Sequence, residues 1–476
     1  MDRRYQLGTD DNKAWLKELR EELFEFGKDF PSPGGGAYYL GDDGTPWKDR
    51  PRETWITSRM AHVYSIGAIL YGDSAKAWDV EHGSEKLKYD TYGRLADRAL
   101  SGLRGELHDI KHGGWYAGLA SDGSILETKQ CYAHAFVILA AASGFLAGRD
   151  GAEELLSDAL SVYDKYFWDE ETGLSVDTWN TEFTGLSEYR GLNANMHSVE
   201  AFLAVYDALG DTKYLDRAGR IIDHVASWAE ENAWRIPEHF KSDWTPDLSC
   251  NEDKPDDPFK PYGATPGHGI EWARLITQWA AAMFNKDRSS SVIEKESFDV
   301  WNVDKGRSEH DRGGTSEALI KGDRECLHGD NIPYDIKYRP YIMVAENLYK
   351  RAVDDAWNCD GARGIVYTTD WNGKPVVHDR MHWTLAEAIN TSAVLYRVTG
   401  DERYASDYAE FIRYLDEVVH DKINGSWFHQ LDRNNKVIGT VWPGKSDIYH
   451  ALQATLIPYN ERVGVSIAKA VKEIIV

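Results

Sequence analysis

Histidine occurs in the same setting at several points of this chain, just after an aromatic-rich turn and at the start of an apolar stretch. In three places a carboxylate stands three residues away: His197-x-x-Glu200, His268-x-x-Glu271 and Asp447-x-x-His450. On a helix this spacing puts both groups on one face. A lone histidine of this kind is more often a hydrogen-bonded core residue than a catalyst. Recurrence favours chemistry instead, because histidine exchanges protons near neutral pH and a partner carboxylate orients it.

The same residue types could also bind a metal ion. Glutamate and histidine three residues apart on several helices hold di-iron and di-manganese centres, where the order is Glu-x-x-His. Here the order is His-x-x-Glu, and no further carboxylate falls clearly into place. We therefore expect acid/base chemistry by histidine, with no metal and no cofactor.

Aromatic side chains cluster near the same positions and could stack on a sugar ring. They are Trp55, Trp115, Tyr116, Trp272, Trp383, Trp427 and Trp442. The alternative is packing between helices and turns, which we expect for about half of them.

Helices must bring these residues together, and the sequence predicts six helices that share one pattern. Each follows an aromatic-rich turn, opens with polar residues and then becomes almost wholly apolar. The openings are Arg59/His62, Gln130/His134, His197/Glu200, His268/Glu271, His382/Trp383/Glu387 and Asp447/His450. If all six openings face one axis, they line a single cup with acids, bases and aromatic walls.

Amphipathic stretches with charged outer faces alternate with these apolar helices. They lie near residues 12–28, 86–106, 150–166, 213–230, 338–357 and 402–420. Alternation of amphipathic and wholly apolar helices is typical of an outer ring around an inner ring, so it predicts an all-α fold, an (α/α)6 barrel. Turn signals such as Asp122-Gly123 and Asn372-Gly373 predict short β-hairpins at the rim of one mouth.

One segment interrupts this alternation. Residues from about 286 to 340 are polar and charged, with runs such as Ser289-Ser290-Ser291. We interpret 1–476 as a single catalytic domain, and this segment as an insertion between the fourth inner helix and the fifth outer helix. The insertion is either a surface excursion or a functional element, such as a lid or a contact in a homo-oligomer.

Composition narrows the possible partners. The 54 basic and 78 acidic residues give a net charge of −24, which disfavours nucleic acid and anionic membranes. The four cysteines show no metal-ligand spacing and favour a reducing compartment. No stretch approaches the roughly 18 uninterrupted apolar residues of a membrane span, and the N-terminus lacks the apolar core of a signal peptide. We expect a cytoplasmic enzyme or binding protein.

Several strings of this sequence resemble those of the N-acylglucosamine 2-epimerase superfamily. They lie at 55–62, 113–116, 191–201, 238–240, 265–272 and 447–450. Within the superfamily they look most like the bacterial aldose-ketose isomerases that act on mannose and on sulfoquinovose. The similarity covers nearly the whole chain outside the insertion, and it implies the (α/α)6 barrel and a monosaccharide substrate.

Residue by residue, the resemblance implies that His268 and His450 are the two acid/base catalysts, with His197 beside them in the sugar-binding site. The positions that match residues contacting sugar hydroxyls or orienting the histidines are Arg59, Tyr116, Asn193 (or Asn195), Glu200, Glu271 and Trp383. Further candidates for substrate binding are Trp55, His239, Glu387 and Trp442. Ser446 and His382 stand where the resembling isomerases usually have Gln and Arg, which removes groups that would bind an anionic sugar.

These assignments imply interconversion of an aldohexose, of the sulfoquinovose or D-mannose type, and its 2-ketose through a cis-enediol. We predict that His450 moves the proton between C2 and C1, while His268, steadied by Glu271, opens the ring and serves the oxygens. Three alternatives remain. A sugar 2-epimerase acting on N-acylglucosamine or another aldose would use the same histidines, a glycoside hydrolase would need two carboxylates about 5 to 10 Å apart, and a sugar-binding module would need no proton carriers.

Overall fold

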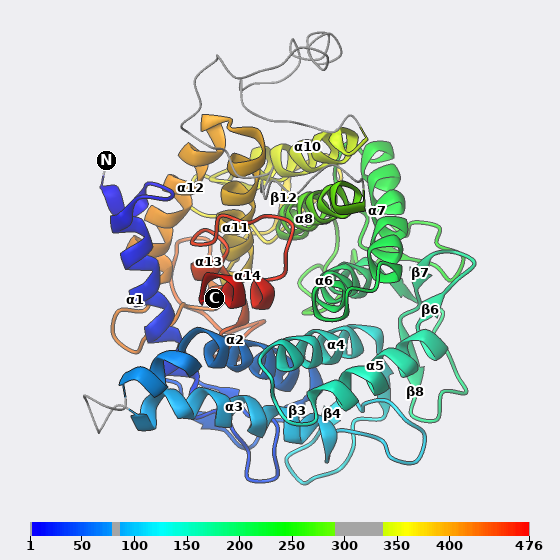
Figure 1. The fold of residues 1–476 in the computed structure, drawn as a ribbon. Helices are drawn as coiled ribbons and strands as arrows, with labels where there is room; N and C mark the ends of the chain where they lie inside the picture. Colours follow the sequence, from blue (N-terminus) through cyan, green and yellow to red (C-terminus); the bar gives the residue numbers. More distant parts are fainter. Residues whose placement is uncertain (1, 79–85, 291–336, 476) are drawn as a thin grey trace.

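Two rings of helices alternate along the chain (Figure 1) in the computed structural model, which describes residues 2–78, 86–290 and 337–475. The inner ring contains α2 (Thr54–Trp78), α4 (Cys131–Leu146), α6 (Leu192–Leu209), α8 (Pro266–Ser290), α11 (His382–Thr399) and α13 (Tyr449–Leu456). The outer ring contains α1 (Asp10–Gly27), α3 (Lys86–Arg104), α5 (Ala152–Tyr166), α7 (Lys213–Glu231), α10 (Arg339–Ala356) and α12 (Glu402–Tyr414). The predicted all-α (α/α)6 barrel is confirmed.

The alternation follows from how much of each helix is apolar. In α4 every residue from 133 to 144 is buried, because this inner helix has protein on all sides. In α5 the buried residues lie on one face, and Glu153 and Glu154 of the first turn are exposed. A helix that is apolar all round must lie inside, whereas an amphipathic helix can cover it and face water.

Short antiparallel strands connect the repeats at the N-terminal ends of the inner helices. Four pairs join successive connections: β3 (Arg52–Glu53) with β4 (Gly118–Leu119), β5 (Thr128–Gln130) with β8 (Thr178–Asn180), β9 (Arg190–Gly191) with β10 (His239–Phe240), and β13 (Arg380–Met381) with β14 (Gln430–Leu431). Three pairs are local hairpins: β1 (Tyr39–Leu40) with β2 (Pro46–Trp47), β6 (Trp168–Asp169) with β7 (Leu174–Ser175), and β11 (Thr368–Thr369) with β12 (Pro375–Val377).

Two further backbone contacts complete this ring of strand pairs. Ala264 and Thr369 exchange hydrogen bonds of 2.9 and 3.0 Å between the connections before α8 and α11. The N–H of Lys445, before α13, donates to the carbonyl of Leu40, before α2, at 3.0 Å. Each inner helix therefore begins from a connection that is bonded to its neighbours, which fixes the N-terminal ends of the inner helices relative to one another.

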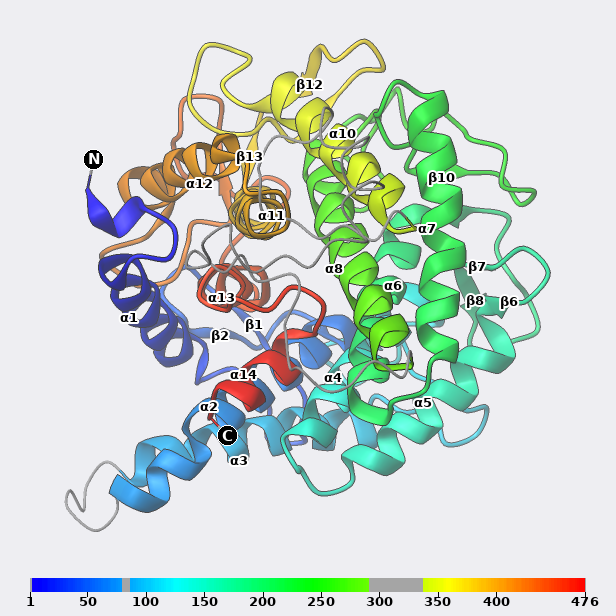
Figure 2. The same ribbon diagram turned by 45° about the horizontal axis from the view of Figure 1, so that its top comes forward.

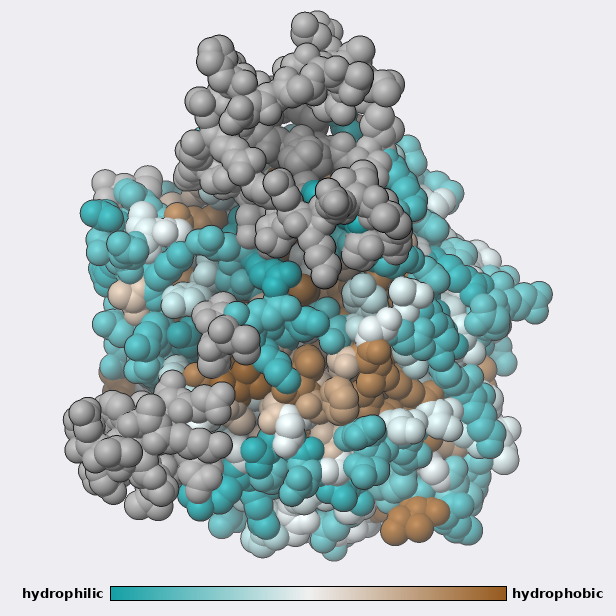
Figure 3. All heavy atoms as spheres, viewed as in Figure 1, coloured by the Kyte–Doolittle hydropathy of each residue, from teal (hydrophilic) through white to brown (hydrophobic). Residues whose placement is uncertain are grey.

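The opposite end of the barrel is covered by the C-terminal helix α14 (Ile467–Ile475), which contacts α2, α4 and α6 (Figures 1 and 2). Hydrophobic side chains gather in a band across this face, over α14 and its neighbours, with hydrophilic residues on either side (Figure 3). The described mouth of the barrel is thus the end with the strand pairs.

The first and last repeats meet at a seam formed by α1 and the short helix η1 (Arg3–Tyr5) on one side and α12, α13 and η3 (Leu415–Val419) on the other. Across this seam the hydroxyl of Tyr5 donates to Asp416 at 2.7 Å. The amide of Asn12 donates to the hydroxyl of Tyr408 at 3.1 Å. These contacts close the ring.

The predicted insertion at about 286–340 falls mostly on residues 291–336, which lie outside the described part of the chain. On either side of it, α8 ends at Ser290 and α10 begins at Arg339. No helix among the described residues is long and apolar enough to cross a membrane.

Candidate active site

His450 directly follows the first residue of α13 and has a partner at each ring nitrogen. Its Nδ1 lies 3.1 Å from Oε1 of Glu387 on α11, and its Nε2 lies 3.5 Å from Nη2 of Arg59 on α2. A carboxylate accepts and a guanidinium only donates, so these partners assign the proton to Nδ1 and the lone pair to Nε2. Burial, reinforced by the charge of Arg59, lowers the pKa of His450 well below its ordinary value. His450 is therefore a neutral base near neutral pH.

His268 lies in the first turn of α8, beside a carboxylate from outside that helix. Oε1 of Glu238, the residue before β10, is 3.0 Å from Nδ1 of His268. Glu271 does not steady His268 as predicted, because its Oε1 accepts from Nη2 of Arg274 at 3.2 Å. That prediction was wrong, since a guanidinium one turn further along the same helix is the stronger partner for a buried carboxylate.

The indole of Trp383 on α11 borders both histidines. Its ring centroid is 5.0 Å from that of His268 and 5.9 Å from that of His450. Trp442, also predicted, lies further out, with its ring centroid 6.4 Å from Trp55 and 5.3 Å from Phe259. The predicted histidines and Trp383 are thus brought together, and Trp442 continues the aromatic wall.

His197 and Glu200 form the pair that their spacing predicts, with Nδ1 of His197 3.2 Å from Oε2 of Glu200 on α6. Glu200 also accepts from the hydroxyl of Tyr449 and, at 3.0 Å, from the amide of Gln453, both on α13. Burial alone would raise the pKa of Glu200, but the bond from His197 and the charge of Arg274 outweigh burial and lower it. Glu200 is therefore ionised.

The guanidinium of Arg274 on α8 lies between two buried carboxylates. Its Nε donates to Oε2 of Glu387 at 2.7 Å, its Nη2 to Glu271, and its Nη1 to Oε1 of Gln278 at 3.1 Å. Burial and the charge of Glu387 raise the pKa of Glu271 well above its ordinary value. Burial also raises the pKa of Glu387, while Arg274 opposes that rise.

Arg59, from α2, is surrounded by aromatic rings and bonded to its neighbours. Its Cζ is 4.8 Å from the ring centroid of Trp55 and 4.6 Å from that of Phe136. Its Nη1 lies 3.3 Å from Oδ2 of Asp447, and its Nη2 donates to the hydroxyl of Tyr132 at 2.9 Å. Residues from all six inner helices therefore meet in one network at the mouth.

Some predicted residues are engaged elsewhere. Both ring nitrogens of His239 are occupied, Nδ1 by the hydroxyl of Tyr189 at 2.8 Å and Nε2 by the carbonyl of Pro261 at 2.9 Å. Tyr116 lies over the ammonium of Lys129, which is 5.9 Å from the ring centroid. Neither contact brings these two residues to His268 or His450.

The two candidate asparagines have different surroundings. Asn195 is bonded to both backbone groups of Ser175 and to the carbonyl of Gly191, so it holds the start of α6 in place. Oδ1 of Asn193 is buried and has no hydrogen-bond partner among the described residues. Asn193 thus remains the candidate for a substrate contact.

His382, directly before Trp383, forms a stacked pair with His429. The two ring centroids are 3.7 Å apart with an interplanar angle of 9°. The ring of His382 is also 6.3 Å from that of His450. Burial lowers the pKa of His382 to about 4 and that of His429 well below its ordinary value, so both rings are neutral at pH 7.

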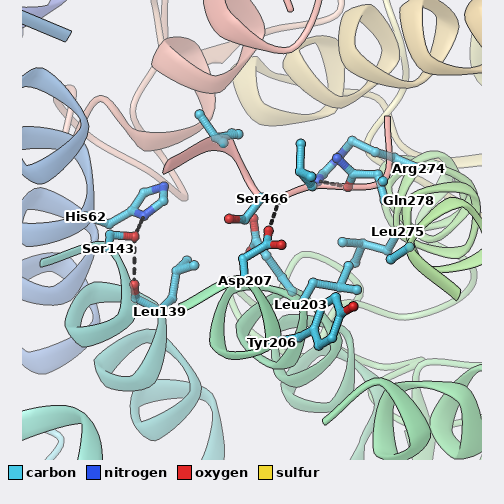
Figure 4. A pocket seen from close by; sticks show the side chains of 15 residues that line it. His62, Leu139, Ser143, Leu203, Tyr206, Asp207, Arg274, Leu275, Gln278 and Ser466 are labelled. Atoms are coloured by element: carbon cyan, nitrogen blue, oxygen red, sulfur yellow. Dashed lines mark hydrogen bonds between the residues drawn. The ribbon is translucent and has the colours of Figure 1, made fainter. Parts of the chain in front are cut away.

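A small cavity lies beneath the network of His450, Glu387, Arg274 and Glu200, on the side of α14 (Figure 4). Its lining includes Glu200 and Arg274, which belong to the network. It also includes Asp207 and residues 464–467, at the end of the barrel that α14 covers. The predicted opening residue His62 lies here as well, with Nδ1 2.7 Å from the hydroxyl of Ser143. Glu200 and Arg274 of the network therefore border a cavity on the side that faces α14.

One group of side chains could hold a metal ion. Ligand atoms of His197, Glu200 and Glu271 lie within 4.8 Å of one another. Glu200 is already bonded to three side chains, and Glu271 to the guanidinium of Arg274, whose positive charge would repel a cation. These donors are better suited to a proton network than to a metal centre.

Several members of this network were not expected from the sequence: Tyr132, Glu238, Arg274, His429, Tyr449 and Gln453. Arg274 had a signal, since it is a charged residue in an apolar helix, three residues after Glu271 and four before Gln278. Glu238 is next to a predicted residue, but nothing local indicates that its side chain faces α8.

The comparisons with known proteins agree with this architecture. The family model described as N-acylglucosamine 2-epimerase (GlcNAc 2-epimerase) matches residues 35–315 and 335–454. The chain is 36% identical over 450 residues to a D-mannose isomerase of Thermobifida fusca, covering 94% of each protein. It is 38% identical over 406 residues to a D-mannose isomerase of Pseudomonas cannabina pv. alisalensis, covering 85% of this chain and 82% of that one.

A crystal structure of D-mannose isomerase has the same fold, with a TM-score of 0.72 and 24% identity over 94% of this chain and 98% of that one. The fold and the relatives together define an isomerase built on a helical double ring. The chain belongs to the N-acylglucosamine 2-epimerase family.

Proposed function

We propose that this protein is an aldose-ketose isomerase that interconverts D-mannose and its 2-ketose. The observation that carries the proposal is that His268 and His450 both lie beside the indole of Trp383, each with a carboxylate at Nδ1. An aromatic side chain suits a sugar ring, and two bases beside it suit proton transfer at adjacent atoms. The relatives named D-mannose isomerase support the choice of reaction.

In the proposed mechanism, His268 transfers the proton that opens the sugar ring. Nε2 of His450 then removes the proton from C2 of the aldose while protonated His268 gives a proton to O1, which yields a cis-enediol and leaves His268 neutral. The imidazolium of His450 returns its proton to C1 as O2 gives its proton to His268, so both histidines return to their starting states and the ketose contains the same atoms as the aldose. Glu387 stabilises the transient charge on His450 through Nδ1.

The charges of the site favour a neutral sugar over a sulfonated one. Its buried cations are each paired: Arg59 with Asp447, Arg274 with Glu387 and Glu271, and Lys445 with Asp421 at 2.7 Å. The stacked histidines His382 and His429 are neutral. A sulfonate has only acceptor oxygens and would need an unpaired cation, whereas a hydroxyl needs only a hydrogen-bond partner.

Proton NMR in heavy water tests the reaction. The chelator-treated protein is incubated with D-mannose and, separately, with sulfoquinovose. We expect D-mannose to give the ketose, with solvent deuterium at C1 wherever the transferred proton exchanges. A C2-inverted aldose as the product would instead identify an epimerase, and no reaction with either sugar would remove the proposal.

Replacing the catalytic histidines tests their roles. We expect His450→Gln and His268→Gln each to lower turnover by a factor on the order of 100 or more, because each removes one proton carrier. His224→Gln is the matched control, since His224 lies on the outer helix α7 and bonds the carbonyl of Thr172. Near-normal turnover of His450→Gln would remove the assignment of the C2 base.

The pH dependence follows from the lowered pKa of His450. A base is active when unprotonated, so a lowered pKa keeps it active as the pH falls through 6.5. We expect kcat/KM for D-mannose to stay level from pH 8 to pH 6.5 and to fall only at lower pH. Half-maximal activity at or above pH 6.5 would contradict a buried histidine base.

A further inference from the structure

Arg274 connects His450, the proposed base, to the end of the barrel that α14 covers. Its side chain is 2% exposed and lines the cavity beneath the network, beside Gln278 (Figure 4). From there its Nε reaches Oε2 of Glu387, whose other oxygen, Oε1, faces Nδ1 of His450. One carboxylate thus connects the guanidinium to the imidazole.

We propose that Arg274 is a positioning residue for His450, which acts by keeping Glu387 ionised and thereby keeping the lone pair of His450 on Nε2. Its effect on turnover rests on the proposed isomerase function, whereas its effect on the proton of His450 does not. His450 can act as a base toward the sugar only when its proton lies on Nδ1, because Nε2 then has a free lone pair.

The charges of the buried groups explain why Glu387 needs the guanidinium of Arg274 to stay ionised. Glu271 and Glu387 are both fully buried and both bond Arg274, whose charge also acts on Glu200. Burial and the charges of Glu387 and Glu200 raise the pKa of Glu271 well above its ordinary value, so Glu271 is the carboxyl group that most readily keeps its proton, while Glu387 faces Arg274, Glu200 and His197. Glu387 is the ionised member because it has the shorter bond to Arg274 and a second donor in His450.

Removing the guanidinium of Arg274 should move the proton of His450 from Nδ1 to Nε2. Without Arg274, burial raises the pKa of Glu387 further, so that Glu387 binds a proton near neutral pH. A protonated carboxyl can donate to Nδ1 of His450, and the imidazole then carries its own proton on Nε2. That tautomer has no lone pair toward the sugar. Activity returns only when the pH rises above the new pKa of Glu387.

Arg397 provides a control for the loss of a guanidinium that is partly buried. It lies near the same end of the barrel on α11, and its Nη1 donates to the carbonyl of Ile457 at 2.8 Å. Its partners are backbone carbonyls, including that of Pro458, rather than carboxylates. Arg397→Met should therefore lower stability without changing the protonation of the site.

The kinetic experiment compares Arg274→Met, Arg274→Lys and Arg397→Met with the wild type on D-mannose. We expect Arg274→Met to lower kcat about 10- to 100-fold at pH 7, with KM within about threefold, and to move the acid limb of the pH profile upward. Arg274→Lys keeps a cation and should recover most of the loss. An unshifted pH profile in Arg274→Met, as in Arg397→Met, would overturn the inference.

The second experiment needs no substrate and separates the inference from the proposed function. Nitrogen-15 NMR of the imidazole rings, with His450 assigned from the His450→Gln spectrum, reports which nitrogen is protonated. We expect Nδ1–H in the wild type and in Arg274→Lys, and Nε2–H in Arg274→Met. Nδ1–H in Arg274→Met would overturn the inference even if the protein isomerised no sugar.

A double-mutant cycle covers the case in which Arg274→Met does not fold. Arg274→Gln, which removes the charge but keeps a polar side chain, is then compared in the wild-type and Glu387→Gln backgrounds. If Arg274 acts through Glu387, the loss of kcat caused by Arg274→Gln should disappear in the Glu387→Gln background. Equal losses in both backgrounds would overturn the inference.

Discussion

Asp207 lies at the end of the barrel that α14 covers, where burial makes its ionisation unfavourable. Its Oδ2 accepts from the N–H of Ser466 at 2.5 Å, which ties α6 to the chain before α14. Burial raises the pKa of Asp207 from 3.8 to about 6. Between these values the folded protein binds more protons than the unfolded chain, so the stabilising contribution present below about pH 4 is lost as the pH rises through about 6.

Asp207→Asn should therefore stabilise the protein at pH 7.5 but not at pH 4. The amide keeps an oxygen to accept from Ser466 and carries no charge to bury. We expect Tm to rise by roughly 1–3 °C at pH 7.5 and to stay level or fall at pH 4, measured by thermal unfolding at both values. An equal effect at both pH values would mean that ionisation of Asp207 does not influence stability.

The individual site residues could be predicted from the sequence better than their partners. Spacing identified His197 with Glu200, because both lie on one helix and their distance is a local property. The carboxylates at His268 and His450 come from other elements, Glu238 and Glu387. Those pairings depend on how the helices and their connections lie relative to one another in the ring, which no local pattern contains.

Close packing between α3 and the loop before α2 gives a test at the level of the helices. A Cβ on Gly102 would lie 2.2 Å from the backbone nitrogen of Gly36, so the two backbones touch there. Gly102→Ala should lower the free energy of unfolding by about 2 kcal/mol or more, because the loop must move to accommodate a methyl group. Urea unfolding measures the loss.

Gly72 on α2 is the control for this substitution. A Cβ at Gly72 would meet nothing within 4 Å. Alanine is the better helix former, so Gly72→Ala should stabilise the protein by up to about 1 kcal/mol. If both substitutions had the same effect, the contact of α3 with the loop would not be the reason for Gly102.

The helices themselves could be predicted with small errors, and the strand pairs could be predicted only in part. A predicted helix near 338–357 is α10 (Arg339–Ala356), because its apolar spacing is a property of the segment alone. The hairpin signal at Asn372-Gly373 marks the turn between β11 and β12. Pairs such as β3 with β4 join segments from successive repeats, so they exist only once the ring has formed.

For the molecule as a whole, the seam between the first and last repeats is the contact that closes the ring. Asn12 is fully buried there and bonds both Tyr408 and the carbonyl of Arg4. Asn12→Ala should lower the free energy of unfolding by about 1–3 kcal/mol, since it leaves buried polar groups without partners. Urea unfolding followed by fluorescence and by activity measures this loss.

Lys13→Ala is the neighbouring control. Lys13 forms a surface ion pair with Glu461 at 2.9 Å, and such pairs contribute at most about 1 kcal/mol. Both variants should keep the wild-type kcat while folded, because neither side chain reaches the mouth. A large effect of Lys13→Ala or a small one of Asn12→Ala would show that the seam is held by other contacts.

The position of His450 on the last inner helix has a consequence for how this protein is made. As the chain leaves the ribosome, α2 and α11 lack the neighbour that α13 provides, and exposed apolar surface of this kind is prone to aggregation. The ring can close against α1 only after α13 has been synthesised. Only then can His450 reach Glu387. Activity should therefore arise as a single late event in biosynthesis, and a chain terminated before α13 should have none of it.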